Sequence, residues 1–397
     1  MINVEAWLVP VADGKYHRCH NLRGFEASRL RGFERLRPRC ASGFSETVIP
    51  LRDGGLRAVV APMFNALIVG GTGLISTGIV KQLLRRGARV SMYNRGRREN
   101  TVPEGVQQIV GNRDDAAAFV TTFAEQRFDV VYDMICFSPA QAEASVRAFS
   151  GRCQQFVFCS TVCAYSVKTP PGVLIDETWP LEPVSEYGRN KVLCERSFER
   201  AAQNGAFELT IVRPSHTYGP GSSLIDQQEF DSGTWDRVAR GLPVLVAGDG
   251  LGLWQSTHRD DCGKLFAHAA LAPRTFGQSY NATRDEVLTW RDYYREVARA
   301  LDTHAKVIFV PTRWLLAQDP KRFAFLSETT QFHGAYSSAK AKSHVPEFRA
   351  TIGLEAGARE TFADMRRRAA WRDSGSDLPY QRIVERALAL GFEIEEA

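Results

Sequence analysis

The stretch from residue 66 to residue 98 constrains the fold of this 397-residue chain more than any other segment. It reads ALIVGGTGLISTGIVKQLLRRGARVSMYNRGRR and opens with an apolar run, Ala66 to Val69, typical of a buried parallel strand. Gly70 and Gly73 then lie in a tight turn that favours glycine. Apolar residues follow at helical spacing, and a second strand is expected over 88–93. The pattern predicts a strand, a glycine turn, a helix and a strand.

This arrangement is typical of the first unit of a dinucleotide-binding fold, because bare backbone at the turn admits a pyrophosphate. The N-terminus of the following helix offers free N–H groups and the positive end of its dipole to the same anion. We therefore expect the turn and the first helical residues to bind a cofactor, through Gly70, Gly73, Leu74 and Ile75. The alternative is an ordinary strand-to-helix turn whose glycines serve packing alone.

Strands and helices alternate along the chain after this first unit, and the links between them are short. We expect further strands over 106–110, 128–134, 155–160 and 208–213. We expect helices over 114–126, 139–149 and 187–203. Repeated strand–helix units of this kind predict an α/β fold, a doubly wound parallel sheet (Rossmann) with helices on both faces.

The regular alternation ends beyond Pro214. Helices are expected over 230–240, 260–270, 290–301 and 356–370, and short strands over 243–246 and 306–310. This half predicts a smaller C-terminal substrate lobe over the sheet edge at which such folds bind ligands. The expected domains are a basic extension over 1–62, a dinucleotide-binding Rossmann domain over 63–220 and a mixed substrate-binding lobe over 221–397.

The composition, with 44% hydrophobic and 24% charged residues, is typical of a globular protein. The formal net charge of +5 is small for this length and does not by itself indicate a nucleic-acid partner. The longest apolar runs are far shorter than a membrane span, so no membrane partner is expected. The eight cysteines include no CxxC pairs at zinc-site spacing, which predicts reduced thiols in a cytoplasmic protein and no metal site.

Residues 1–62 contain many arginines and little sustained periodicity. They have no apolar h-region and carry several acidic residues, so neither a signal peptide nor a transit peptide is expected. Our hypothesis is that Met63, shortly before the first strand, is the true start. Residues 1–62 would then be a translated upstream stretch or a loosely ordered arm. The alternative is a genuine basic extension that packs on the domain, and mass spectrometry of the native N-terminus distinguishes the two.

Polar residues that could carry chemistry stand after the predicted strands. Ser160 and Thr161 come at the end of one strand, and Tyr187 and Lys191 lie about one helical turn apart. A tyrosine is a poor base at neutral pH because its pKa is about 10. The Lys191 ammonium is expected to favour the phenolate and so to lower the pKa of Tyr187. With Thr161 orienting an alcohol or carbonyl, the set suits hydride transfer. The alternative is a turn and an ordinary surface pair.

Taken in order, the motifs resemble those of the short-chain dehydrogenase/reductase superfamily, in its extended, epimerase/dehydratase branch. The resemblance runs from about residue 63 into the 300s. The matching features are the glycine motif at Gly70, Gly73 and Ser76, the segment VFCSTVCAY with Thr161, the YxxxK pair Tyr187 and Lys191, the RPxxxYGPG stretch from Arg213 to Gly221, and His258-Arg259-Asp260-Asp261 in place of HVDD.

The resemblance implies a bound NAD or NADP, with Lys191 also holding the nicotinamide ribose and Pro214 near the cofactor. After the second strand, Asn94 and Arg95 stand where NAD-preferring members carry an acid. Arginine pairs with a 2′-phosphate, so NADP is slightly favoured over NAD. The alternative is a solvated basic loop. Asn112 and Arg113 resemble the segment beside the adenine, with Asn112 in place of the usual acid.

The resemblance further implies a sugar or nucleotide-sugar substrate, contacted by Ser160, His216 and Trp254. Trp254 stands where many nucleotide-sugar members carry an arginine for the pyrophosphate, which argues against a UDP- or dTDP-sugar. This tryptophan would stack on a base or sugar, or fill the core of the lobe, and we favour core packing. These departures resemble a divergent subgroup that includes the chloroplast stem-loop-binding proteins, some of which bind RNA.

The expected function is therefore an NAD(P)-dependent epimerase, dehydratase or reductase that acts on a sugar or nucleotide sugar. One alternative is an RNA-binding or cofactor-sensing protein on the same fold, although the modest charge argues against a nucleic-acid partner. The other alternative is a simple NADPH carbonyl reductase with an exchangeable cofactor. The resemblance also implies a homodimer, formed through the helices over 139–149 and 187–203.

Overall fold

A computed structural model describes residues 64–97, 102–167, 172–228 and 232–397, together with four short strands before residue 61. The chain divides into two compact units, Met1–Ala61 and Pro62–Ala397. In the first unit, the described strands form antiparallel pairs, β1 (Val9–Pro10) with β2 (Tyr16–His17), and β3 (Glu46–Pro50) with β4 (Leu56–Val60). The proposed start at Met63 lies outside the described residues, and so does Arg98.

A seven-stranded sheet forms the centre of the second unit, in the order β15-β10-β9-β8-β5-β6-β7. Every neighbouring pair in it is parallel. Its strands are β5 (Asn65–Val69), β6 (Arg89–Asn94), β7 (Gln107–Val110), β8 (Phe128–Asp133), β9 (Cys153–Cys159), β10 (Glu208–Pro214) and β15 (Gln278–Ala282). Most of the inner strands are near-continuous apolar runs, as expected for a sheet that is covered on both faces. The predicted doubly wound α/β fold is confirmed.

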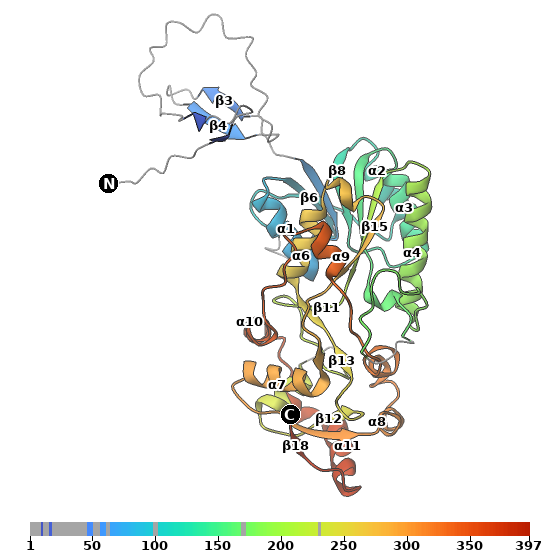
Figure 1. Ribbon diagram of the computed structural model, residues 1–397, viewed down its shortest axis with the longest axis vertical. Helices are drawn as coiled ribbons and strands as arrows, with labels where there is room; N and C mark the ends of the chain where they lie inside the picture. The colour runs from blue at the N-terminus through green and yellow to red at the C-terminus, as the bar shows by residue number, and fades with distance from the viewer. Residues whose placement is uncertain are drawn as a thin grey trace, which may run out of the picture. The chain divides into compact units, whose positions relative to one another are not determined.

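Helices cover both faces of this sheet (Figure 1). One face packs against α1 (Leu74–Arg85), α6 (Arg259–Ala269) and α9 (Ala339–His344). The other packs against α2 (Ala116–Thr122), α3 (Pro139–Phe149) and α4 (Glu186–Gln203). Helices α1 and α6 touch through their backbones, because a Cβ atom on Gly78 would lie 2.3 Å from the carbonyl oxygen of Arg259. An ion pair between Lys81 and Asp260 also joins the two helices.

The remaining elements form a second core at the other end of this unit (Figure 1). A small sheet contains β12 (Val244–Ala247), β17 (Lys306–Val310) and β18 (Glu395–Glu396). Around it lie α5 (Gly233–Ala239), α7 (Trp290–Ala300), α8 (Thr312–Gln318), α10 (Leu354–Arg367) and α11 (Leu378–Ala389). Buried aromatic side chains fill this core, notably Trp235, Trp290, Tyr293 and Tyr294.

Two short strand pairs connect the large sheet to this second core. In the parallel pair, β11 (His216–Tyr218) joins β14 (Ser256–His258), and in the antiparallel pair, β13 (Leu253–Trp254) joins β16 (Leu288–Thr289). Short helical turns are Val162–Ala164, Pro273–Thr275 and Ser374–Ser376, with one π-helical turn at Leu326–Thr330. The Asp261 carboxylate accepts hydrogen bonds from the amides of Thr351 and Ile352 at 2.9 and 2.8 Å, which ties α6 to the segment before α10.

The structure differs from the sequence expectation in three places. The sequence did not place the strands β11, β13, β14, β15, β16 and β18 or the helices α8, α9 and α11. Residues beyond 221 return to the large sheet through α6, α9 and β15. The expected domain boundary between residues 220 and 221 stays a prediction. Helix α2 is shorter than the expected 114–126: Asp115 caps its start by accepting a hydrogen bond from the Ala118 amide at 3.0 Å, and the helix ends at Thr122.

None of the described helices is both long and apolar enough to cross a bilayer. The six cysteines in the described part of the chain are free thiols, while Cys19 and Cys40 lie outside it. Within the same part, no group of three or more His, Cys, Asp or Glu side chains could hold a metal ion. A cytoplasmic location stays a prediction.

Candidate functional site

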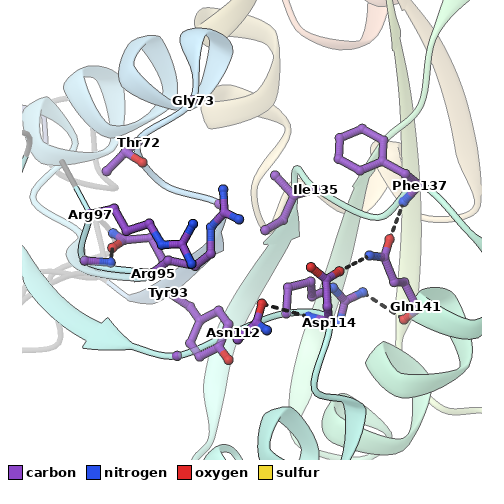
Figure 2. Close-up of a pocket in the computed structure, with 15 residues that line it drawn as sticks. Thr72, Gly73, Tyr93, Arg95, Arg97, Asn112, Asp114, Ile135, Phe137 and Gln141 are labelled. Carbon is purple, nitrogen blue, oxygen red and sulfur yellow. Dashed lines mark hydrogen bonds between the residues drawn. The ribbon is translucent and has the colours of Figure 1, made fainter.

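A cavity of about 330 Å³ opens at the carboxyl ends of β5, β6 and β8 (Figure 2). The strand order reverses between β5 and β8, and open α/β sheets bind ligands at such a switch point. This first cavity is lined by Gly70, Thr72, Gly73, Tyr93, Asn94, Arg95, Gly96, Arg97, Gly111, Asn112, Arg113, Asp114, Ile135, Phe137 and Gln141.

The glycine turn forms one wall of the first cavity. Gly70 has a φ of +90°, and a Cβ atom on it would lie 2.5 Å from Cγ2 of Ile135, so a side chain does not fit there. The Gly70 carbonyl accepts hydrogen bonds from the Gly73 amide at 3.1 Å and from the Ser76 hydroxyl at 2.8 Å. Gly73 caps α1 without a side chain, and the first turn contains no acid. The amides of that turn therefore remain open to an anion.

Asn94 and the residues after it form a second, basic wall. The Asn94 side-chain oxygen accepts hydrogen bonds from the Gly96 amide and from the Gln108 side chain, both at 2.8 Å. Figure 2 shows Arg95 and Arg97 near Thr72, on the opposite side of the cavity from Gln141. Neither arginine forms an ion pair within the described residues.

Arg113 closes the floor of the first cavity. Its Nη2 donates to the Asp133 carboxylate at 3.0 Å and to the Ser145 hydroxyl at 2.8 Å, and its guanidinium lies 4.2 Å from the centre of the Phe119 ring. Its Nε and Nη1 are buried without partners among the described residues, and so are the Asn94 Nδ2 and the Tyr93 hydroxyl. Buried polar groups without partners are costly, so this cluster indicates a polar ligand.

A second cavity, of about 510 Å³, lies beside Thr161 and Tyr187 and is mainly apolar and aromatic. It is lined by Thr161, Val162, Cys163, Tyr165, Ser166, Val167, Ile175, Val184, Ser185, Tyr187, Pro214, Ser215, His216, Trp254, Gln255, Phe325, Glu328, Thr329, Phe332, His333, Gly334 and Tyr336. The large sheet, the short strands β11 and β13, and the segment 325–336 each contribute a wall.

The two cavities meet at a pair of aromatic rings. Phe137 lines the first cavity and Tyr187 the second, and their ring centres are 6.5 Å apart. Lys191 lies behind them, with its Nζ 4.7 Å from the Phe137 ring centre and 5.9 Å from the Tyr187 ring centre. The buried Lys191 ammonium donates to the carbonyl oxygens of Cys136 at 2.9 Å and Cys159 at 2.8 Å.

The structure therefore brings most of the predicted site residues to these two cavities. Those lining the first are Gly70, Gly73, Asn94, Arg95, Asn112 and Arg113. Those lining the second are Thr161, Tyr187, Pro214, His216 and Trp254. The side chains of Leu74 and Ile75 line neither cavity, although both residues lie in the open first turn of α1. Ser160 also lines neither, because its buried hydroxyl donates to the Glu195 carboxylate.

Comparison with known proteins decides the family. Residues 66–282, more than half of the chain, match the profile described as "NAD dependent epimerase/dehydratase family". This chain belongs to the NAD-dependent epimerase/dehydratase family. The matched range includes the strands of the large sheet and the residues of the first cavity.

Relatives of this epimerase/dehydratase-family enzyme are distant. It is 29% identical over 269 residues to the "2'-dehydrokanamycin reductase" of Streptomyces kanamyceticus, covering 68% of this chain and 75% of that protein. It is 22% identical over 321 residues to the chloroplast stem-loop binding protein of 41 kDa b of Arabidopsis thaliana, covering 76% and 80%. Among solved structures, a UDP-glucose 4-epimerase of Thermotoga maritima, determined with UDP-glucose, superposes with a TM-score of 0.62. That match has 18% identity and covers 77% of this chain and 99% of the other, so it shows the fold alone.

Tyr187 of this family member departs from the expectation about its charge. Burial raises the pKa of the Tyr187 phenol above its ordinary value, and a hydrogen bond with the Thr161 side chain offsets only part of that rise. The expected lowering of the Tyr187 pKa is wrong, because desolvation by burial is the largest influence on this phenol and raises its pKa. The residue is 45% exposed and lines the second cavity, so it remains within reach of a ligand.

Ser256 connects two of the predicted substrate residues. Its hydroxyl lies 2.9 Å from Nδ1 of His216 and accepts the Nε1 hydrogen of Trp254 at 3.1 Å. Burial lowers the pKa of His216 to about 3, so this imidazole is neutral at physiological pH. Trp254 also stacks on Trp290, with 5.0 Å between the rings. The tryptophan thus packs in the core, as favoured, and also lines the second cavity.

A buried ion pair supports the wall of the second cavity. Arg213 donates to the Glu195 carboxylate through Nη2 at 2.7 Å and through Nε at 3.0 Å. The same arginine donates to the Tyr165 hydroxyl at 3.0 Å, and Tyr165 donates to the Asn281 side chain at 2.7 Å. Because a lost partner would leave a buried charge uncompensated, we expect the network to hold Tyr165 and the end of β9 rigidly.

No functional role was expected for the segment 325–336, although it supplies seven lining residues of the second cavity. These are Phe325, Glu328, Thr329, Phe332, His333, Gly334 and Tyr336. All of them except Gly334 recur at helical spacing (i, i+3, i+4, i+7, i+8 and i+11), which is the signal by which the sequence could have pointed to this wall. A π-helical turn, a feature common at functional sites, occupies Leu326–Thr330.

Proposed function

We propose that this enzyme binds NADP or NAD in the first cavity and transfers hydride to or from an oxygen-bearing carbon of a carbohydrate in the second. The observation that carries the proposal is the junction of the cavities. The ring of Tyr187 lies 6.5 Å from that of Phe137, between the glycine turn and the apolar cavity. Such a junction suits a ligand whose reactive ring must face a separate substrate.

The residues of the first cavity fit a nicotinamide dinucleotide. The turn at Gly70 leaves bare backbone, and the first turn of α1 offers amides to a pyrophosphate. The partnerless nitrogens of Asn94 and Arg113 match the hydrogen-bonding capacity of an adenosine. Arg95 and Arg97, with no acid at the end of β6, favour NADP slightly over NAD.

When bound, the nicotinamide supplies or accepts the hydride. Tyr187 then moves the proton: in a reduction, its neutral phenol donates the hydroxyl hydrogen to the carbonyl oxygen of the substrate. Thr161, whose side chain lines the same cavity as Tyr187, orients that oxygen. Lys191 donates hydrogen bonds to the carbonyl oxygens of Cys136, shortly after β8, and of Cys159, at the end of β9. Its ammonium group therefore lies close to the junction of the two cavities. In an oxidation, the Tyr187 phenolate would have to accept the hydroxyl proton of the substrate, and the raised pKa of this phenol disfavours that form.

Reductases differ from epimerases and dehydratases in whether the cofactor is consumed in the net reaction. The Streptomyces kanamyceticus relative is named as a reductase, which favours reduction of a sugar ketone with an exchangeable cofactor. The family description favours an epimerase or a dehydratase, in which the cofactor stays bound through the cycle. A homodimer through α3 and α4 remains part of the proposal and rests on the family resemblance.

The test is to identify the small molecule that leaves the purified protein on denaturation, and to titrate the emptied protein with NADPH and with NADH. We expect one nicotinamide dinucleotide per chain. Turnover of added NADPH with a keto sugar supports the reductase, whereas tightly held cofactor supports the epimerase or dehydratase. Failure to bind either dinucleotide overturns the proposal.

A second candidate is RNA binding on the same fold. The Arabidopsis thaliana relative is named as a stem-loop binding protein, which favours this function, and Arg95 and Arg97 could contact phosphates. A salt-dependent shift of a stem-loop RNA in a native gel would support this function. The absence of any shift at low salt would remove it.

A further inference from the structure

The second cavity contains little positive charge. Among the described residues that line it there is no Lys or Arg, and the one carboxylate is that of Glu328. Of the two histidines in the wall, His216 is neutral because it is buried, and Nδ1 of His333 accepts the Leu253 amide hydrogen at 3.2 Å. A diphosphate would find no charge-assisted donor in this part of the cavity.

Aromatic rings form much of the wall. Trp254, Phe325, Phe332 and Tyr336 line the cavity together with Tyr165, whose ring lies 6.1 Å from that of Tyr336. Aromatic faces cover the apolar faces of sugar rings, and they attract ammonium groups through their negative quadrupoles. The same faces offer no attraction to a phosphate.

Glu328 lies on the π-helical turn Leu326–Thr330, between Phe325 and Thr329 in the cavity wall. Its side chain is exposed and forms no ion pair or hydrogen bond within the described residues. A carboxylate without a protein partner, set in an aromatic wall, is available to pair with a charged group of a ligand.

We propose that the second cavity takes an amine-bearing carbohydrate without a diphosphate, with the Glu328 carboxylate pairing with the substrate ammonium and the aromatic wall covering the sugar. This inference rests on the proposed function, because the second cavity is taken as the substrate site. In this proposal, residues 325–336 select the substrate by its charge. A nucleotide sugar is disfavoured because the described wall offers its phosphates no lysine or arginine and contributes the negative charge of Glu328.

The test compares three probes by calorimetry on the full chain saturated with NADP⁺: kanamycin, its fully N-acetylated derivative, and UDP-glucose. We expect kanamycin to bind about tenfold more tightly than the acetylated probe, and UDP-glucose to bind no better than the latter. Glu328→Gln should weaken kanamycin about fivefold, the upper range for an exposed ion pair, and leave the acetylated probe unchanged. Glu393→Gln, an exposed carboxylate outside the cavity, is the matched control and should change neither.

Three results overturn the inference: no binding of kanamycin, tighter binding of UDP-glucose, or equal effects of Glu328→Gln on both aminoglycoside probes. Lys168 follows the cavity residue Val167 in sequence and lies outside the described residues. If the protein prefers UDP-glucose and Lys168→Met abolishes that preference, Lys168 binds the phosphates, and this result also overturns the inference. If NADPH binds while UDP-glucose is preferred, only the substrate inference fails. If no nicotinamide dinucleotide binds, the proposed function fails whatever the sugar probes show.

Discussion

Gly70→Ala is expected to damage both the stability of the fold and the first cavity. The residue has a φ of +90°, a conformation that costs an L-residue about 1–2 kcal/mol. The new Cβ atom would lie 2.5 Å from Cγ2 of Ile135, and relieving such an overlap in a packed core costs about 1–3 kcal/mol more. The free energy of unfolding should therefore fall by about 2–5 kcal/mol.

Gly87→Ala is the matched control for this prediction. Gly87 has a φ of +73°, but a Cβ atom on it would meet nothing within 4 Å. Only the backbone strain applies there, so we expect a loss of about 1 kcal/mol. Urea denaturation followed by circular dichroism gives both free energies, and quenching of NADPH fluorescence on the folded variants gives the dissociation constants.

The difference in stability and in NADPH binding between the two variants tests the proposed role of the glycine turn. Gly70→Ala should lose at least about 1 kcal/mol more than Gly87→Ala, and should bind NADPH at least about tenfold more weakly than the unchanged chain. Gly87→Ala should bind NADPH normally, because it lies at the far end of α1. Equal losses of stability, together with unchanged NADPH binding in Gly70→Ala, would refute the reasoning about the turn.

Three further predictions concern the chemistry of the two cavities. Tyr187→Phe should lower turnover at least about 100-fold while changing NADPH affinity by less than about twofold, and full activity would show that another group moves the proton. The double change Arg95→Ala and Arg97→Ala should weaken the binding of NADPH about tenfold more than that of NADH in parallel titrations. Equal weakening of the two would show that these arginines form a solvated loop and do not contact a 2′-phosphate. Burial lowers the pKa of His216 from 6.5 to about 3, so between those pH values the unfolded chain binds the additional proton. The free energy of unfolding should therefore decrease as the pH falls through that window, and His216→Asn should flatten this part of the profile.

The sequence allowed the first unit to be predicted closely because its signals are local. Strand β5, the glycine turn and α1 follow from an apolar run, a φ that favours glycine and a helical period. Helix α3 matches its expected bounds of 139–149, since Ser138 caps it and Pro139 occupies its first turn. Such features depend on residues close together in the chain.

The parts that could not be predicted depend on contacts between distant residues. Strand β15 has only a short, mixed sequence, and its place comes from pairing with β10. The hydroxyl of Ser160 was expected to face a substrate, but Glu195, 35 residues later in the chain, accepts its hydrogen bond. The rise in the Tyr187 pKa likewise follows from tertiary burial, which the Tyr–Lys spacing alone does not reveal.

A crystal structure of the full chain with NADP⁺ tests the central claim most directly. The account predicts that the pyrophosphate lies against the amides that follow Gly73 and that the nicotinamide lies at the junction of the cavities, beside Thr161 and Tyr187. A dinucleotide bound elsewhere, or a nicotinamide remote from the Tyr187 phenol, would contradict it.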